Sequence, residues 1–119
     1  MSYDLRFAVK VNMGDECRFV TIGYPEYEHP TYNYSKMFRS CMNWDYEQGE
    51  YYKFSDIEKN VLNGINELER YPAKYRQYEP ENKWGTVEGA LKVLKGLYRD
   101  MYEISEERDV PLEYLYLRW

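Results

Sequence analysis

Residues that commonly perform catalysis or bind metal ions are scarce in this sequence. Its one histidine, His29, lies between Glu28 and Pro30, with no second histidine and no Cys-x-x-Cys pair to complete a metal site. The two cysteines, Cys17 and Cys41, fit no metal-binding or redox spacing, so the sequence predicts reduced, buried thiols. No metal ion or other cofactor is therefore expected.

Glycines and carboxylates also give no specific catalytic motif. The seven glycines never form the glycine-rich patterns that cradle phosphate groups. Neighbouring carboxylates, such as Asp45 with Glu47 or Glu106 with Glu107, are the residue types of a general acid–base pair. In an acidic protein, however, such pairs are far more often solvated surface residues. A small carboxylate-based hydrolase is therefore the third hypothesis, behind two kinds of binding protein.

Tyrosine is more frequent in this chain than in most proteins. Of the 119 residues, 15 are Tyr, and the rings concentrate in residues 24–34, 44–52 and 75–84, accompanied by cations such as Arg39, Lys53 and Arg118. A tyrosine combines a flat apolar face with a hydroxyl group, which suits protein interfaces and pockets that stack bases. The structural alternative to a binding role is that tyrosine replaces Phe and Leu around a modest core. Aliphatic residues and Phe already fill the expected core positions, so several rings are left for the surface or a cleft.

The charge balance narrows the range of partners. With 21 acidic and 16 basic residues the net charge is −5, which disfavours direct binding to nucleic acid or to an anionic membrane. No apolar run is long enough for a transmembrane helix and no signal-peptide pattern opens the chain, so a cytoplasmic protein is expected. Carboxylates spaced over one face would also suit a mimic of the nucleic-acid backbone, although basic residues are interspersed along the whole chain.

The clearest expected element is an N-terminal antiparallel hairpin. From Leu5 to Met13 the odd-numbered residues are apolar, which is the period of a half-buried strand. Residues 14–16 supply the turn, and residues 17–22 are rich in β-branched and aromatic side chains, as a returning strand is. Pro25 and Pro30 then interrupt any helix or inner strand, so residues 23–31 are expected to form an ordered surface loop.

Three helices are expected between residues 31 and 109. The first is short, with an apolar face over residues 34–42 and Thr31 or Asn33 as its cap. The second follows a capping box at residues 55–58 and ends near Tyr71, because Pro72 cannot continue it; one helical turn around residues 74–76 follows. The third and longest begins after its cap Thr86 and ends before residue 110.

The last nine residues place Leu115, Leu117 and Trp119 on one face, which predicts a third strand, with a short helical turn as the competing interpretation. The element order β-β-α-α-α-β predicts an α+β protein in which an N-terminal antiparallel hairpin and a C-terminal strand form a sheet covered on one face by three helices. We expect a single domain over residues 1–119. The sequence leaves open whether residues 111–119 pair within the chain or with another subunit.

Several short segments resemble small uncharacterised proteins that phages and mobile elements of Gram-positive (Firmicutes) gut bacteria carry. The resemblance rests on residues 3–11, 30–39, 41–46 and 84–85 and on the ending at residues 115–119, so it spans nearly the whole chain. It includes no catalytic motif. Small proteins of this setting resemble counter-defence factors, which inhibit CRISPR nucleases or sequester nucleotide second messengers of bacterial immunity. The resemblance therefore implies a partner among the host-defence components.

Residues and resemblance together predict a non-enzymatic binding protein in the cytoplasm of the bacterial host. In the first hypothesis it sequesters a nucleotide-derived immune signal in an aromatic and arginine pocket, which a homo-oligomer would suit. In the second it is an acidic, tyrosine-rich inhibitor of a defence nuclease. The expected ligand- or partner-binding residues are Tyr32, Asn33, Arg39, Trp44, Asp45, Tyr46, Trp84 and Arg118. The structural alternative makes Trp44 and Trp119 core anchors and Asn33 a helix cap.

Overall fold

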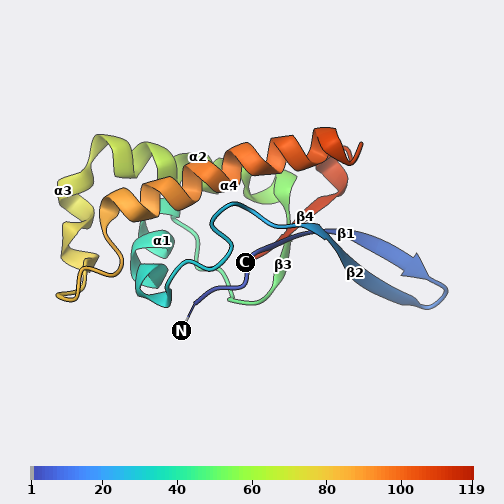
Figure 1. Cartoon of the computed structure of the whole chain (residues 1–119), viewed down its shortest axis with the longest axis horizontal. Helices are drawn as coiled ribbons and strands as arrows, with labels where there is room; N and C mark the ends of the chain where they lie inside the picture. The colour runs from blue at the N-terminus through green and yellow to red at the C-terminus, as the bar shows by residue number, and fades with distance from the viewer. Residues whose placement is uncertain (1) are drawn as a thin grey trace.

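One four-stranded antiparallel sheet and a layer of helices make up the fold, which confirms the predicted α+β class (Figure 1). The computed structural model describes residues 2–119. Its strands are β1 (Arg6–Met13), β2 (Glu16–Gly23), β3 (Tyr51–Lys53) and β4 (Leu115–Arg118). Their order across the sheet is β2-β1-β4-β3, so the strand that comes last in the chain lies between β1 and β3.

The predicted hairpin and the predicted C-terminal strand are both present. Gly14, with a φ of 67°, takes the first central position of the two-residue turn between β1 and β2. Strand β4 pairs with β1 from Leu115, opposite Val9, to Arg118, opposite Arg6. The C-terminal segment therefore pairs within its own chain, which the sequence alone leaves open.

Four α-helices follow the hairpin, namely α1 (Ser35–Met42), α2 (Phe54–Arg70), α3 (Pro72–Tyr75) and α4 (Val87–Glu107). Single 3-10 turns lie at η1 (Tyr32–Tyr34), η2 (Arg76–Tyr78) and η3 (Leu112–Tyr114). The predicted cap of α4 is confirmed, because the Thr86 side chain accepts a hydrogen bond from the Gly89 N–H. The predicted end of the second helix is confirmed as well, since Pro72 opens α3. None of the helices within residues 2–119 is both long and apolar enough to cross a membrane.

Two details around β3 differ from the prediction. The sequence does not predict strand β3. Its three residues are too few to reveal a period, and they lie in a polar and aromatic segment. The capping box predicted at Ser55 does not form. Instead α2 begins two residues earlier, with Lys53 and not Ser55 as N-cap, and no side chain of the cap bonds the free N–H groups. Phe54 is buried, so the start of α2 is fixed by packing of this ring and not by a polar cap.

The core lies between the helices and the face of the sheet that they cover. Helices α1 and α4 both pack on α2. Along α4, the side chains of Val87, Ala90, Leu94, Leu97 and Met101 are buried. The largest fully buried side chains come from both layers and are Trp119, Tyr3, Tyr75, Phe7, Phe38 and Phe54.

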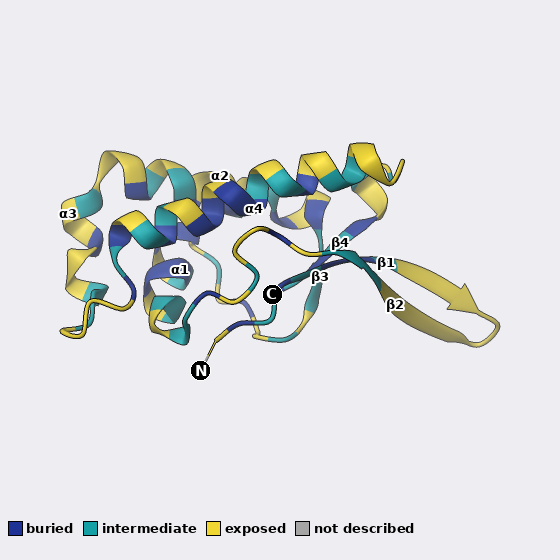
Figure 2. Cartoon of the chain, in the orientation of Figure 1, coloured by how far each residue is buried: buried dark blue, intermediate teal, exposed yellow. Residues whose placement is uncertain are grey.

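The far part of the hairpin projects beyond the helices as an arm, which we define as residues 10–20, and every residue of the arm is exposed (Figure 2). The alternating pattern predicts that Val11 and Met13 face the core together with Leu5 and Phe7. Leu5 and Phe7 are buried, but the exposed fractions of Val11 and Met13 are 37% and 58%. The alternation is present, yet it continues past the end of the layer that could cover it.

The predicted loop between β2 and the first helix is part of the body of the molecule. The backbone N–H of Tyr3 donates to the Pro30 carbonyl at 2.8 Å, and that of Leu5 donates to the Glu28 carbonyl at 3.0 Å. Both prolines of the loop are buried. The loop therefore anchors the segment that precedes β1, and only part of it is surface.

Candidate functional site

Two of the aromatic residues predicted to bind a ligand, Trp44 and Tyr46, form a cluster with Trp119 at the core. Trp119 and Tyr46 are buried, and their ring centroids lie 5.0 Å apart. Trp44 is half-buried, with centroid distances of 5.3 Å to Tyr46 and 5.9 Å to Trp119. Because a buried ring has no face open to a ligand, Tyr46 is a core residue. Trp44 and Trp119 are core anchors, which was the structural alternative for them.

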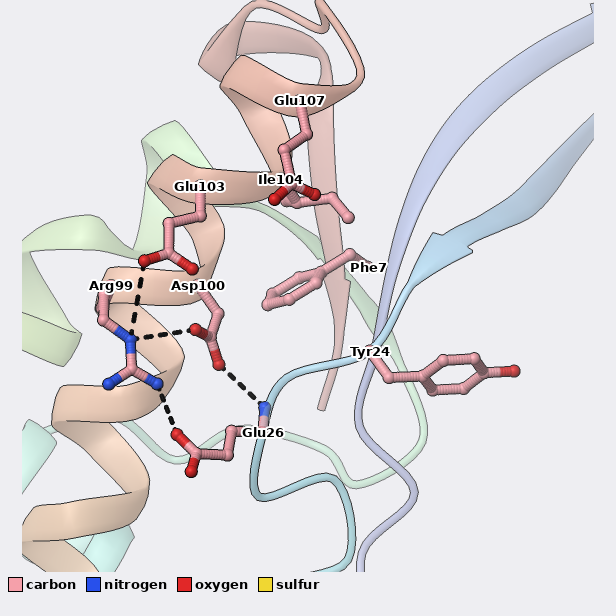
Figure 3. Close-up of a pocket in the computed structure, with 8 residues that line it drawn as sticks. All are labelled: Phe7, Tyr24, Glu26, Arg99, Asp100, Glu103, Ile104 and Glu107. Carbon is pink, nitrogen blue, oxygen red and sulfur yellow. Dashed lines mark hydrogen bonds and ion pairs between the residues drawn. The ribbon is translucent and has the colours of Figure 1, made fainter.

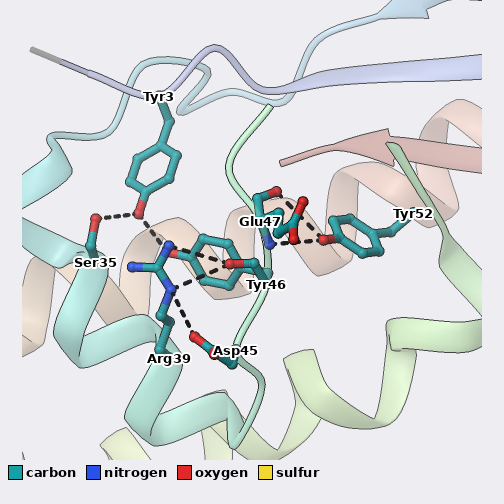
Figure 4. A network of polar contacts seen from close by, with 7 residues as sticks. All are labelled: Tyr3, Ser35, Arg39, Asp45, Tyr46, Glu47 and Tyr52. Carbon is teal, nitrogen blue, oxygen red and sulfur yellow. Dashed lines mark hydrogen bonds and ion pairs between the residues drawn. The ribbon is translucent and has the colours of Figure 1, made fainter. Parts of the chain in front are cut away.

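Arg39 and Asp45 fasten this cluster to α1 (Figure 4). The Arg39 guanidinium lies 4.3 Å from the centroid of the Tyr46 ring, and its Nε and Nη2 donate to the Tyr46 carbonyl at 3.4 and 3.3 Å. The Asp45 carboxylate lies 3.5 Å from Arg39 Nε. The Tyr46 hydroxyl contacts the hydroxyl of Tyr3, which shares a 2.6 Å hydrogen bond with Ser35 Oγ. Burial, together with the contact to Tyr3, raises the pKa of Tyr46, so this hydroxyl stays protonated.

The other predicted site residues are distributed over different parts of the surface. Tyr32 is half-buried and meets the Tyr3 ring edge-on at 5.0 Å. Asn33 is exposed and lies beside Gly85, where an added Cβ would come within 3.1 Å of Asn33 Cβ. Asn33 does not cap η1, because the cap is the hydroxyl of Thr31. Trp84 is 70% exposed in the same loop as Gly85. Arg118 lies in the sheet, so the eight residues do not converge on one site.

A second set of aromatic and basic side chains lies on the face of the sheet that points away from the helices, which we call the outer sheet face. Residues directly opposite each other in paired strands project from the same face of a sheet. The core residues Phe7 and Leu117 alternate with this set along β1 and β4. The register gives two rows on the outer sheet face, Arg6–Arg118–Tyr51 and Ala8–Tyr116–Lys53.

Phe19 of β2 closes over the outer sheet face. Its ring stacks on Tyr51 with a centroid distance of 4.1 Å and an interplanar angle of 2°, and it meets Tyr116 edge-on at 5.0 Å. Since β2 and β3 are the two edge strands, these rings meet only because the sheet is strongly twisted and curled. Ala8, opposite Tyr116 on this face, is fully buried. The outer sheet face therefore has a small aromatic core of its own.

Asp4 holds the two arginines of the first row. Its carboxylate lies 2.5 Å from Arg6 Nη2 and 3.7 Å from Arg118 Nη1, and its backbone carbonyl accepts a 2.6 Å hydrogen bond from Arg118 Nη1. The hydrogen bond from Arg6 lowers the pKa of Asp4 below its usual value, so this carboxylate is charged at neutral pH. One carboxylate for two guanidinium groups leaves a net positive charge at this end of the face.

The second row borders a hollow of about 330 Å³ at the point where β4 begins and β1 continues into the arm. Two lysines and two tyrosines dominate its walls. Its lining residues are Val9, Lys10, Asn12, Lys53, Tyr114 and Tyr116. Within residues 2–119, neither Lys10 nor Lys53 forms an ion pair with a carboxylate. Both ammonium groups are therefore available to an anion.

A hollow of about 270 Å³ beside α4 is acidic, and its arginine is paired with three of its carboxylates (Figure 3). Arg99 lies 2.5 Å from the Glu26 carboxylate, 3.1 Å from Asp100 and 3.9 Å from Glu103. Asp100 also accepts a 2.8 Å hydrogen bond from the backbone N–H of Glu26. These bonds fasten the loop at Glu26 to α4, and the surplus of carboxylates disfavours an anionic ligand.

The third hollow, of about 520 Å³, lies between residues 26–31 and α4. Tyr27 and Tyr34 form part of its wall, together with Lys92 and two glutamates. One of these, Glu28, lies 3.5 Å from Nε2 of His29. Because charges of both signs line this hollow, its chemistry does not favour one class of ligand.

The two cysteines differ in burial, and the histidine lies beside the backbone of Tyr3. Burial raises the pKa of the Cys41 thiol to about 12, so this thiol is protonated and unreactive. Cys17, by contrast, is exposed in the arm, which corrects the prediction of two buried thiols. His29 Nδ1 lies 3.1 Å from the Tyr3 carbonyl. Within residues 2–119, no three His, Cys, Asp or Glu side chains are placed together to hold a metal ion.

Sequence reasoning missed the outer sheet face, although the alternation of residues carries a signal for it. Arg6 and Lys10 in the first strand, and Tyr116 and Arg118 in the last, alternate with the core residues. The alternation that assigns odd-numbered residues to the core assigns these four to the opposite face. The order of the strands, which brings Lys53 opposite Tyr116, has no counterpart in the local pattern.

No model of a known protein family, no curated protein and no solved structure matches the chain. The choice among the three hollows therefore depends on their chemistry. The hollow on the outer sheet face combines unpaired positive charge with aromatic rings, and we take it as the candidate site.

Proposed function

We propose that the protein is a non-enzymatic binding protein that captures a nucleotide-derived ligand on its outer sheet face. A single observation carries the proposal. In a chain with a net charge of −5, Lys10 and Lys53 meet two tyrosine rings in one hollow, and neither lysine is paired with a carboxylate within residues 2–119. Phosphate groups and a flat heterocycle are the ligand chemistry that complements this combination.

Each part of the hollow has a separate role in this proposal. Lysine ammonium groups bind phosphate through charge-assisted hydrogen bonds. Tyr114 and Tyr116 offer ring faces on which a base can stack, a contact worth about 1–3 kcal/mol per base. A volume of about 330 Å³ falls within the range of small-molecule sites. The negative charge of the whole chain opposes long nucleic acids, so the site favours a small anion.

We propose further that the captured ligand is a nucleotide signal of bacterial immunity, and that the protein sequesters it for a phage or mobile element. This step rests on the resemblance of residues 30–39 and 41–46, and of the other segments, to proteins of that setting. A sequestering protein needs affinity and abundance, and it needs no catalytic group.

The first test is binding of a ligand panel that contains a cyclic dinucleotide, ADP-ribose and AMP, measured by thermal shift and by isothermal titration calorimetry. We expect at least one of them to raise the melting temperature. A ligand present at a hundred times its dissociation constant stabilises the folded state by about 2.7 kcal/mol. Absence of any shift across the panel would contradict the proposal.

Two double variants then test whether the ligand binds in the hollow on the outer sheet face. The double variant Lys10→Gln, Lys53→Gln removes two charge-assisted contacts of about 1.5–3 kcal/mol each, so we expect affinity to fall about a hundredfold or more. The matched control is Lys36→Gln, Lys59→Gln, which changes the charge equally at two exposed helical positions away from the hollow. Equal affinity losses in the two double variants would show that the hollow is not the binding site.

A second candidate function is inhibition of a defence protein with a basic groove. The end of α4 favours it, because its last turn contains Glu106 and Glu107 and no basic residue. Negative charge at a helix C-terminus opposes the helix dipole, at a cost of about 0.3–1 kcal/mol per charge. Capture of a nuclease from a defence-carrying lysate, lost in the variant Glu106→Gln, Glu107→Gln and retained in the lysine double variant, would support this function instead.

A further inference from the structure

The arm is the part of the molecule that the body leaves uncovered. Residues 10–20 are all exposed, and the chain measures 49 Å along its longest axis against 25 and 22 Å along the others (Figure 2). The arm carries large apolar side chains on both of its faces, namely Val11, Met13, Phe19 and Val20, with exposed fractions of 37–58%. Exposed apolar side chains on a projecting hairpin indicate a contact surface.

The outer edge of β2 is open for pairing. Strand β2 ends the sheet, and no other segment of residues 2–119 pairs with this edge. A two-residue turn makes Met13 and Glu16 a hydrogen-bonded pair, and such pairs alternate along an antiparallel ladder. The backbone N–H and C=O groups of Cys17, Phe19 and Thr21 therefore point away from β1. They form a row of three residues with free donors and acceptors.

This edge has few of the devices that keep strands apart. It contains no proline and no lysine, and half of its residues are β-branched or aromatic. Its one irregularity lies at the base of the arm, where Phe7 pairs with Gly23 and Ala8 with Thr21, so Ile22 is the extra residue of a bulge in β2. The only charged residues, Glu16 and Arg18, lie 3.7 Å apart and compensate each other. The edge is thus neutral and free along the three outward residues.

We infer that β2 pairs with β2 of a second copy of this chain, antiparallel about a two-fold axis at Phe19. In this register the three outward residues face each other, with Phe19 opposite Phe19 of the second copy and Cys17 opposite its Thr21. Each hydrogen-bonded pair exchanges two backbone bonds. The two sheets then form one continuous sheet across the axis, which is the self-complementary arrangement of a two-fold dimer.

Charge and side-chain packing favour a second copy as the occupant. Antiparallel pairing places Arg18 opposite Val20 and Glu16 opposite Ile22 of the other chain, so no like charges face each other. The aliphatic stem of Arg18 covers an apolar side chain that is exposed in the monomer. The bodies, each with a charge of −5, lie at opposite ends of the paired arms. This inference does not depend on the proposed ligand.

Sedimentation velocity over a range of protein concentrations tests the association. We expect a monomer–dimer equilibrium in the wild-type protein. The variant Thr21→Pro removes an outward N–H that β1 does not use, so it should shift the equilibrium to the monomer while the fold is retained. The control Thr21→Ala keeps that N–H and should still dimerise. A protein that is monomeric at every concentration, or a dimer that Thr21→Pro leaves intact, overturns the inference.

Cross-linking tests the register. In the variant Thr21→Cys the new thiol faces Cys17 of the second copy at a separation of about 5.5 Å between Cα atoms, which suits a disulfide. Within one chain these two positions are four strand residues, about 13 Å, apart and cannot be bridged. We expect a covalent dimer under mild oxidation, and none in Cys17→Ser, Thr21→Cys. A covalent dimer in both variants, or in neither, overturns the register.

Discussion

Ala8 shows how one small side chain shapes the outer sheet face. It points away from the helices, yet it is fully buried, because rings from both edges of the sheet close over it. The Phe19 ring reaches Tyr51 only if the residue beneath them is short. A larger side chain at this position would separate the two rings.

We predict that Ala8→Leu destabilises the fold. Extra methylene groups in a packed site cost about 1–3 kcal/mol, and the free energy of unfolding, measured by urea denaturation, should fall by that amount. The control is Ala73→Leu at an exposed position of α3, where the change should stay within about 0.5 kcal/mol. Equal stabilities of the two variants would mean that Phe19 and Tyr51 do not close over Ala8.

Tyrosine marks the limit of prediction for single residues. The sequence predicts that some rings are left for the surface, and five tyrosines and Trp84 are indeed exposed. The sequence does not show which ones. Tyr3, Tyr46 and Tyr75 are buried with their hydroxyl groups bonded to other side chains. A side chain with an apolar ring and a polar end satisfies both environments, so composition and local pattern cannot assign it.

The start of a helix was predictable where the side chain of the N-cap residue accepts a hydrogen bond from a free backbone N–H group of the helix. Thr86 caps α4, whereas the Ser55 capping box does not form because burial of Phe54 moves the start of α2 by two residues, to an N-cap at Lys53. The two positions have the same sequence signature, a hydroxyl residue ahead of an apolar face. Tertiary packing determines which of the two residues caps its helix, and this packing cannot be deduced from the local sequence.

We predict that this difference is visible in stability. Thr86→Ala removes a capping bond and should lower the free energy of unfolding by about 1 kcal/mol. Ser55→Ala removes no cap and replaces an exposed residue inside α2, so its effect should lie within about 0.5 kcal/mol. Chemical denaturation of the two variants beside the wild type measures both. A loss at Ser55 as large as that at Thr86 would mean that Ser55 does cap α2.

Long elements with a sustained period were predicted well, whereas the three-residue strand β3 was not. The 21 residues of α4 and the hairpin follow their patterns, while the three residues of β3 give no period. The predicted burial of Val11 and Met13 in the arm is wrong for another reason. Alternation shows which side of a strand is apolar, but not how far the layer that covers this side extends. The candidate site depends on both failures, because it needs β3 and the open base of the arm.

Across the whole molecule, three carboxylates with lowered pKa values connect separate segments. Asp4 binds arginines near both ends of the chain, Glu67 of α2 accepts a 2.6 Å hydrogen bond from Tyr75, and Glu88 of α4 lies 2.8 Å from Arg76. The hydrogen bonds from Arg6, Tyr75 and Arg76, respectively, are the main causes of the lowered values. Each carboxylate is stabilised in its charged form by folding.

We predict that acid weakens the fold through these groups. A pKa that folding lowers gives stability that is present above the unfolded values, 3.8 for Asp and 4.5 for Glu, and is lost as the pH falls through the folded values. Glu67→Gln should therefore be less stable than the wild type at neutral pH, with the difference shrinking in acid. Denaturation at several pH values measures this, with Glu81→Gln at an exposed loop position as control. A difference between Glu67→Gln and the wild type that is constant with pH would refute the prediction.

The central place of β4 has a consequence for synthesis of the protein. Residues 115–118 leave the ribosome after the other three strands, yet β1 and β3 are joined only through them. Until then the nascent chain holds a hairpin, helices and a detached β3, and the pocket that Trp119 fills is vacant. A premature stop before Leu115 would therefore remove the middle of the sheet and not its edge, and the truncated product should be recognised and degraded.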